Sequence, residues 1–259
     1  EAREVTVGDV VIKAGDWLTM DGASGKVISG QASLIEAGID QNVGTVLGWA
    51  DEVRRLGVRT NADNPADARK AREFGAEGIG LCRTEHMFME EERLPHVRAM
   101  IMSDDVEERE RHLAKLLPFQ REDFQGIFEA MEGLPVTIRL LDPPLHEFLP
   151  DYTEVMVELE RLRLTGAPKD KVAEQEQMAA KVKSLAEANP MLGTRGCRLG
   201  IQWPEIYAMQ VRAIMEAACD VYASSGKAPH VEIMIPLVGF EEELRRMRVL
   251  TEETAAEVL

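Results

Sequence analysis

The amino-acid sequence predicts an α/β fold built on a parallel sheet. From about residue 57 onward, short apolar runs alternate with longer helical segments, which is the pattern of repeated βα units with helices outside the sheet. Three of the apolar runs end at or near an arginine, at Arg83, Arg139 and Arg195. With 259 residues, 45% of them hydrophobic, the chain can bury one sizeable core.

Residues 1–30 are expected to form a separate β segment. Runs of strand-forming residues lie at 10–12, 17–20 and 26–29, and residues 21–25 between the last two contain Asp-Gly and a second glycine, the chemistry of a hairpin turn. So few strands do not make a stable domain alone, so we expect this segment to be the tail of a preceding domain.

The next segments read as helix, strand, helix and strand. A helix is expected over about residues 46–56 and is expected to stop at Gly57. A short strand over 58–61 follows. Asn64 then caps a helix that starts at Pro65 and closes at Gly75, and residues 78–83 form a buried strand.

An acidic loop and two helices, over about 106–117 and 119–132, are expected next. A strand over 136–141 ends at Asp142 because the two prolines that follow cannot extend a sheet ladder. Residues 151–188 are strongly helical and charged, and we expect them to form a helical insertion outside the core.

A further strand is expected over 191–195, a helix from Pro204 to about Ser224, a strand over 231–238 and a helix from about Glu241. Five βα units fall short of the eight of a TIM-type barrel, which needs roughly 250 residues without insertions. We therefore predict an incomplete (β/α)₈ barrel.

Composition excludes several functions. The formal net charge of −16 disfavours nucleic acid as a partner, because a polyanion would be repelled. The sequence contains no run of about 18 uncharged apolar residues, so it does not predict a membrane helix. Three scattered cysteines, Cys82, Cys197 and Cys219, indicate reduced thiols and not a disulfide framework. The first residues lack an initiator Met, so we expect the chain to start within a longer protein or after processing.

Arg83, Arg139 and Arg195 share one topological position. The carboxyl ends of parallel strands form the functional edge of α/β folds, and guanidinium groups bind phosphate or carboxylate through paired N–H donors. The three arginines therefore predict an anion site. The alternative is that each arginine pairs with a nearby acid, such as Glu85, Asp142 or Glu147.

Other candidate groups are weaker. Asp142, His146 and Glu147 have the chemistry of metal ligands, but the prolines between them make a shared face uncertain, so orienting the arginines or facing solvent is the simpler role. Cys82 lies inside a strand and is expected to be a small buried residue, not a nucleophile.

Five segments resemble the pyruvate, phosphate dikinase type of phosphoenolpyruvate (PEP)-utilising enzymes. Residues 78–88, 138–148 and 189–200 resemble three arginine motifs, and 58–63 and 231–237 match flanking barrel strands. The segment Pro-Pro-Leu-His-Glu-Phe after Arg139 favours this type over PEP synthase or enzyme I of the phosphotransferase system, which remain the related alternatives.

The resemblance implies that Arg83 and Arg139 bind the phosphoryl group of PEP, with Arg195 supporting charge in the same pocket. It implies a parent enzyme that interconverts ATP, phosphate and pyruvate with AMP, diphosphate and PEP. The phosphoryl group would be carried by a histidine on a separate swivelling domain. A homodimer in the cytoplasm, or in the plastid of a plant, is also implied.

Under this resemblance, residues 1–30 are the end of the phosphohistidine domain, 31–56 a linker helix, and 57–259 the first part of the PEP- and pyruvate-binding barrel. The family's Mg²⁺ ligands and its proton-donating cysteine belong to later motifs that this sequence does not contain. Glu232 matches a different strand and is not assigned to metal. We thus expect no turnover by the chain alone.

A second hypothesis is a non-catalytic anion-binding or assembly module. A sheet of five strands leaves edges that a closed barrel would hide, and unpaired edges promote association. This hypothesis predicts self-association or a rearranged edge.

Overall fold

A computed structural model describes residues 3–34, 41–186, 189 and 193–259. The chain divides into two compact units, Glu1–Arg54 and Arg55–Leu259.

The first unit contains two antiparallel hairpins. Strand β1 (Glu4–Val7) pairs with β2 (Val10–Lys13), and β3 (Leu18–Asp21) pairs with β4 (Lys26–Ser29). The second hairpin confirms the predicted turn, because Gly25 adopts a φ of 70°, which side-chain-bearing residues rarely adopt. Strand β1 was not predicted.

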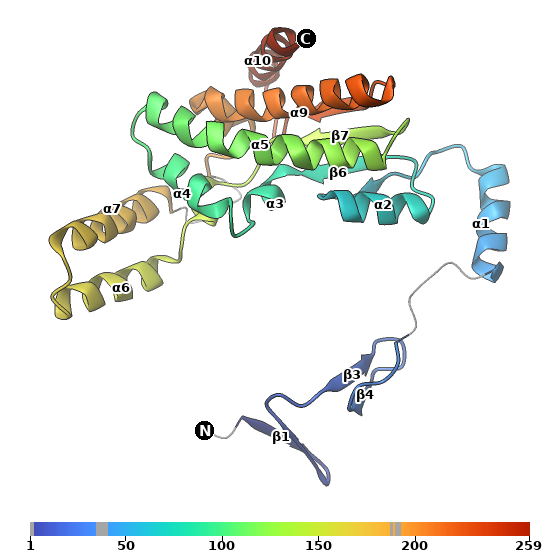
Figure 1. The fold of residues 1–259 in the computed structure, drawn as a ribbon, viewed down its shortest axis with the longest axis horizontal. Coiled ribbons are helices and arrows are strands. Elements are labelled where there is room, and N and C mark those ends of the chain that lie inside the picture. The colour runs from blue at the N-terminus through green and yellow to red at the C-terminus, as the bar shows by residue number, and fades with distance from the viewer. Residues whose placement is uncertain (1–2, 35–40, 187–188, 190–192) are drawn as a thin grey trace. The chain divides into compact units, whose positions relative to one another are not determined.

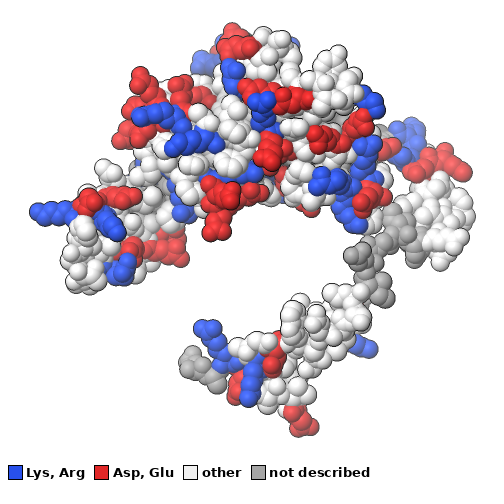
Figure 2. All heavy atoms as spheres, in the orientation of Figure 1, with Lys and Arg blue, Asp and Glu red and all other residues white. Residues whose placement is uncertain are grey.

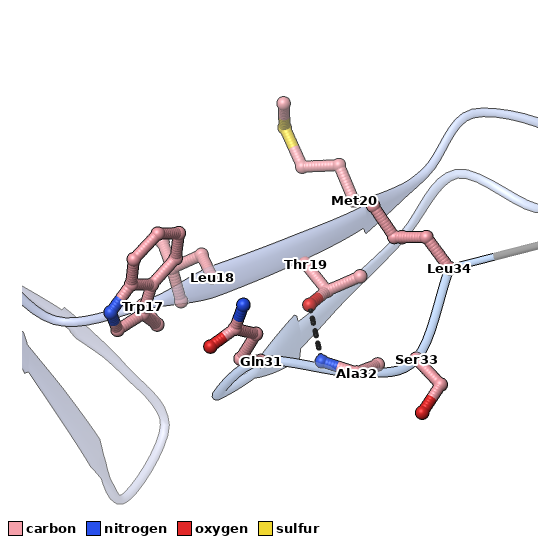
Figure 3. A pocket seen from close by; sticks show the side chains of 8 residues that line it. All are labelled: Trp17, Leu18, Thr19, Met20, Gln31, Ala32, Ser33 and Leu34. Carbon is pink, nitrogen blue, oxygen red and sulfur yellow. Dashed lines mark hydrogen bonds between the residues drawn. The ribbon is translucent and has the colours of Figure 1, made fainter.

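A groove runs along β3 in this unit (Figure 3). Thr19 Oγ1 accepts a hydrogen bond from the Ala32 amide (2.9 Å) and donates one to the Gly30 carbonyl (2.8 Å). These bonds hold the chain after β4 alongside β3. The groove is lined by Trp17, Leu18, Thr19, Met20, Gln31, Ala32, Ser33 and Leu34.

Helix α1 (Gln41–Val53) corrects two predicted boundaries. It starts before residue 46, and it ends before Gly57, which was expected to stop it. The reason is that the chain beyond Gly57 is tied to another segment: Val58 N donates to Glu77 Oε2 (2.9 Å) and Glu77 N donates to the Val58 carbonyl (2.8 Å).

The second unit is built on a parallel sheet with strand order β5-β6-β7-β8, which confirms the predicted fold class. Within the described residues the sheet has four strands and does not close into a barrel. The strands are β5 (Thr60–Asn61), β6 (Ile79–Arg83), β7 (Pro135–Arg139) and β8 (His230–Met234).

The strand predicted over 191–195 is not part of this sheet. Residues 191–192 lie outside the described residues, and Gly193–Arg195 form a bend instead. The reason is that β7 and β8 pair directly. The chain after the bend bridges the ends of these two strands, because Gly196 N donates to the Asp142 carbonyl (2.9 Å) and Cys197 N donates to the Pro236 carbonyl (3.0 Å).

Helices α2 (Pro65–Glu73), α5 (Val106–Ala130) and α9 (Pro204–Ser225) cover the sheet, with α5 and α9 side by side (Figure 1). The caps follow the prediction. Asn64 Oδ1 accepts from Asp67 N (2.8 Å), and α9 ends at Gly226 with a φ of 71°. Helix α10 (Glu241–Val258) packs on α9.

Helix α5 runs unbroken where two helices were predicted. Pro118 lies inside it and is exposed, so the missing amide hydrogen bond leaves a carbonyl that water can reach. On the opposite face, Leu113, Leu116 and Phe124 are buried in the core. Burial of this continuous apolar stripe outweighs the helix-breaking tendency of the proline.

Helices α6 (Tyr152–Leu164) and α7 (Lys169–Leu185) form the predicted charged helical pair, which projects from one end of the sheet layer (Figure 1). The expectation that this pair lies wholly outside the core is wrong. Val155, Ala179 and Val182 belong to the buried cluster, because α7 contacts the short 3₁₀ helix η1 (Leu145–Phe148).

Three short helices were not predicted. Helices α3 (Thr84–Phe88) and α8 (Cys197–Gln202) have five and six residues, too few to show a helical period. Helix α4 (Leu94–Met102) lies where part of a loop was expected.

Acidic and basic side chains alternate over the visible surface of the second unit, with several acidic clusters (Figure 2). Within the part of the chain that is described, no helix combines the length and apolarity needed to cross a membrane.

Candidate anion-binding site

Arg83 and Arg139 lie at the same level on neighbouring strands. Each is the last residue of its strand, β6 or β7, and the two are register partners in the parallel pairing. Thr84 Oγ1 also donates a hydrogen bond to the Arg139 carbonyl (3.0 Å), which ties the start of α3 to the end of β7. The predicted convergence of these two arginines at the carboxyl edge of the sheet is therefore observed.

Arg195 reaches the same edge from the turn before α8. Gly196 makes this turn possible: its φ is 56°, and a Cβ there would lie 3.0 Å from the Pro236 carbonyl oxygen and 3.2 Å from Asp142 Oδ1. Any larger residue would be strained and crowded. Arg195 Nη2 lies 2.8 Å from Asp142 Oδ2.

Asp142 joins two of the three arginines. Its Oδ2 accepts from Arg195 Nη2 and also from Arg139 Nη1 (3.1 Å), while Arg139 Nη2 pairs with Glu85. The Asp142 side chain is only 6% exposed. Charge-assisted bonds of this kind fix guanidinium groups in place. Glu85 and Asp142 thus orient arginines, as the alternative interpretation held, whereas Glu147 is exposed.

Asp63 holds the third arginine. Its Oδ1 accepts from the backbone amide of Arg83 (2.7 Å), and its Oδ2 accepts from Arg83 Nε (3.1 Å) and Nη2 (2.7 Å). His86 Nδ1 lies 2.8 Å from the same Oδ2. Burial acts to raise the pKa of Asp63, but the hydrogen bonds and charge of Arg83 outweigh it, so the pKa lies below its usual range.

The segment that carries Asp142 is anchored to helix α9. Leu141 N donates to Gln210 Oε1 (2.9 Å), and Tyr207 Oη donates to the Leu141 carbonyl (2.7 Å). Burial raises the pKa of the Tyr207 hydroxyl, which keeps it protonated as a donor. These two hydrogen bonds from the helix layer fix the position of the backbone that precedes Asp142.

Some buried polar atoms of this cluster accept or donate no hydrogen bond within the described part of the protein. Among the described residues, Glu85 Oε2, Arg139 Nε and Asp142 Oδ1 are buried without a protein hydrogen-bond partner. Buried polar groups usually bind water or a ligand when protein partners are missing. The cluster holds three arginines and three carboxylates, and Arg83, with 35% of its side chain exposed, is the most accessible of the three arginines.

A separate ion pair crosses the same sheet. Arg59 Nη1 lies 2.6 Å from Glu232 Oε2, and Thr137 Oγ1 donates to the same oxygen (2.6 Å). The Arg59 side chain passes over β6 at Gly80, where an added Cβ would lie 3.2 Å from Arg59 Cβ. The hydrogen bonds from Arg59 and Thr137 lower the pKa of Glu232. Glu232 is thus engaged by Arg59.

The remaining candidates take minor roles. Cys82 is fully buried, and burial raises the pKa of its thiol, in agreement with the expected core position. His146 is half-buried. Within the described ranges, no three His, Cys, Asp or Glu side chains are arranged to hold a metal ion.

Sequence reasoning missed Asp63, His86, Tyr207 and Gln210 as parts of the site. A signal existed for Asp63, because it lies two residues past the end of β5, close to the level at which β6 and β7 end in arginines. The two helix residues gave no signal, since their polar atoms reach the site from an otherwise apolar helix face.

Comparison with known proteins identifies the relatives of this chain. Residues 39–259 match the family model of the PEP-utilising enzyme, PEP-binding domain. The chain is 52% identical over 250 residues to a pyruvate, phosphate dikinase of Rhizobium meliloti (strain 1021), covering 96% of this chain and 27% of that protein. It is 50% identical over 259 residues to the chloroplastic pyruvate, phosphate dikinase of Flaveria pringlei, covering 100% and 26%.

A pyruvate, phosphate dikinase of Entamoeba histolytica (strain ATCC 30459 / HM-1:IMSS / ABRM) is 50% identical over 243 residues, which are 93% of this chain and 27% of that protein. The chain thus spans about a quarter of the length of the curated relatives it matches. The match to the family model covers most of the sequence and includes all three arginines. This chain belongs to the family of PEP-utilising enzymes, and its residues 39–259 match their PEP-binding domain.

Proposed function

We propose that this chain binds PEP and pyruvate at the edge formed by Arg83, Arg139 and Arg195, as part of a pyruvate, phosphate dikinase. The observation that carries the proposal is the pairing of Arg83 with Arg139 at adjacent strand ends, with Arg195 joined to Arg139 through Asp142. Identities of 50–52% to proteins of that name support it.

In this proposal the arginines bind and orient the phosphoryl group. Arg83 and Arg139 present N–H donors to phosphoryl oxygens, and Arg195 adds positive charge next to Arg139. Positioning and charge stabilisation are the main requirements of phosphoryl transfer. The carboxylates of Asp63, Glu85 and Asp142 would keep each guanidinium in a fixed orientation, so that little rearrangement is needed when the anion arrives.

The whole protein would interconvert ATP, phosphate and pyruvate with AMP, diphosphate and PEP through a phosphohistidine. Residues 1–30 would be the end of the phosphohistidine domain, 31–56 a linker helix and 57–259 the first part of the barrel. The proposal also includes an ATP site, a homodimer, a cytoplasmic or plastid location, and Mg²⁺ held by side chains outside the arginine cluster. The chloroplastic names of plant relatives support the plastid alternative.

Isothermal titration of the chain with PEP tests the proposal. We expect binding by the unaltered chain and loss of at least about tenfold in affinity, roughly 1.4 kcal/mol, in Arg139→Ala. Arg212→Ala is the matched control, because Arg212 also pairs with a glutamate, Glu257, but lies on the helix layer. Equal affinities of Arg139→Ala and Arg212→Ala would contradict the proposed site.

An assembly role is the second candidate, and the exposed edge of β8 favours it. Next to this edge lies an apolar groove between α9, β8 and the end of α10. Within the described residues, β8 has a strand neighbour on one side only. Such edges promote pairing with another chain.

A further inference from the structure

Asp63 occupies an unusual position among the acids of the site. Glu85 and Asp142 contact Arg139 or Arg195 through side chains alone, whereas Asp63 contacts both the backbone and the side chain of one arginine. Its Oδ1 accepts from the Arg83 amide at the end of β6, so the carboxylate is joined directly to the end of the strand. With 11% of its side chain exposed, Asp63 is shielded from competing water.

Arg83 needs such an anchor more than the other two arginines do. Its side chain is 35% exposed, against 21% for Arg139 and 13% for Arg195. An exposed arginine side chain samples many rotamers, and ordering it costs conformational entropy. Asp63 occupies the Nε and Nη2 edge of the guanidinium, which fixes its plane before any ligand binds.

The surroundings of Asp63 are acidic. A small pocket beside Asp63 is lined by three further carboxylates, from helices α2 and α5 and the loop after α3, together with Asn64, His86 and Met87. These carboxylates belong to Asp67, Asp123 and Glu90. Asp123 and Glu90 both pair with Arg93, and Asp67 Oδ2 accepts from Asn64 Nδ2 (2.7 Å), so Asp63 is the carboxylate of this pocket that holds Arg83.

We propose that Asp63 is a positioning residue, which holds the Arg83 guanidinium at the sheet edge in the one orientation that captures an anion. The ligand class rests on the proposed function, but the positioning of Arg83 does not. His86, whose Nδ1 lies against the same carboxylate oxygen, supports the orientation of Asp63 from helix α3.

Two measurements on the full chain test this role. The first is the NMR signal of the Arg83 Nε–Hε group without ligand, assigned by its loss in Arg83→Ala. We expect slow hydrogen exchange in the unaltered chain and in Asp67→Asn, and at least about tenfold faster exchange in Asp63→Asn. Asp67 is the matched control because it lies in the same pocket. Unchanged exchange in Asp63→Asn would overturn the proposal.

The second measurement is PEP affinity by calorimetry. Asp63→Asn is expected to weaken binding about tenfold, or 1.4 kcal/mol, and to have no effect in the Arg83→Ala background, because a positioning residue acts only through its arginine. An equal loss in both backgrounds would contradict positioning. Asp63→Glu, which keeps the charge, should retain most of the affinity and serves if Asp63→Asn does not fold. Absence of PEP binding by the unaltered chain would refute the proposed function, while the exchange measurement still decides the role of Asp63.

Discussion

Tyr207 on helix α9 donates its hydroxyl hydrogen to the backbone carbonyl of Leu141, two residues past the end of β7, over 2.7 Å. Both residues are buried. Together with the bond from Leu141 N to Gln210 Oε1, this hydrogen bond connects the helix layer to the residue that precedes Asp142, which in turn contacts Arg139 and Arg195.

Removing that hydroxyl should destabilise the chain. Tyr207→Phe leaves the buried Leu141 carbonyl without this donor, and we expect the free energy of unfolding in urea to fall by about 1–2 kcal/mol. Tyr222→Phe is the control, because Tyr222 lies on the same helix but is 57% exposed. A similar loss in both variants would argue that the Tyr207 bond adds nothing specific.

Asp142→Asn should lower the free energy of unfolding more than the removal of any single exposed charge does. The change removes the negative charge that Arg139 and Arg195 share, and breaking a buried ion pair by removing one partner costs about 3 kcal/mol or more. Glu147→Gln, an exposed acid in the same segment, should change the free energy of unfolding by less than about 0.5 kcal/mol. Denaturant titration of the two variants gives the comparison.

Pro118→Ala should stabilise helix α5. The alanine supplies the amide donor that the proline lacks and removes the ring clash, while the unfolded chain gains some entropy, so we expect a net gain of about 1–2 kcal/mol. Lys115→Ala, also on the exposed side of α5, provides the baseline. A loss of stability in Pro118→Ala would mean that the helix geometry depends on the proline ring.

The Arg59–Glu232 pair should make stability depend on pH. The folded-state pKa of Glu232 is lowered, so its contribution is fully present above the unfolded pKa, about 4.3, and is lost as pH falls through the folded pKa. The difference in unfolding free energy between the unaltered chain and Glu232→Gln should therefore be about 0.5–1 kcal/mol at pH 7 and smaller near pH 3. A difference that grows on acidification would contradict this sign.

The edge of β8 should promote self-association. Ile233→Lys places a charge in the apolar groove beside this edge, a substitution that discourages strand pairing. We expect a lower apparent mass at high concentration than for the unaltered chain in sedimentation experiments. Val249→Lys, on the exposed side of α10, should leave association unchanged. A chain that stays monomeric at all concentrations would remove the assembly role.

The position of Arg83 at the end of β6 was predictable from the local sequence, although the ends of β7 and β8 were not. Strand β6 ends at Arg83 as predicted, whereas β7 ends at Arg139, two residues before the predicted end, and β8 ends at Met234, four residues before the predicted end. Parallel pairing brings Arg83 and Arg139 together. The caps at Asn64 and Gly226 were also predictable from the local sequence, since each depends on residues within one turn.

The partners of the arginines were only partly predictable. Asp142 was foreseen because it lies three residues after its partner Arg139. Glu85 was named as a partner for its proximity to Arg83 in the sequence, but it pairs with Arg139 across 54 residues, and Asp63 contacts Arg83 across 20 residues. Pro118 and Gly57 led to wrong helix boundaries for a different reason. Each residue signals a local break, but helix α5 continues through Pro118 and helix α1 ends before Gly57.

The register between β6 and β7 fixes the separation of the Arg83 and Arg139 backbones at the strand spacing, about 4.8 Å. Backbone hydrogen bonds set that separation, and core side chains do not. Substitutions among core side chains should therefore leave the distance between the Arg83 and Arg139 backbones unchanged. A one-residue insertion in either strand, in contrast, would turn its arginine to the opposite face of the sheet.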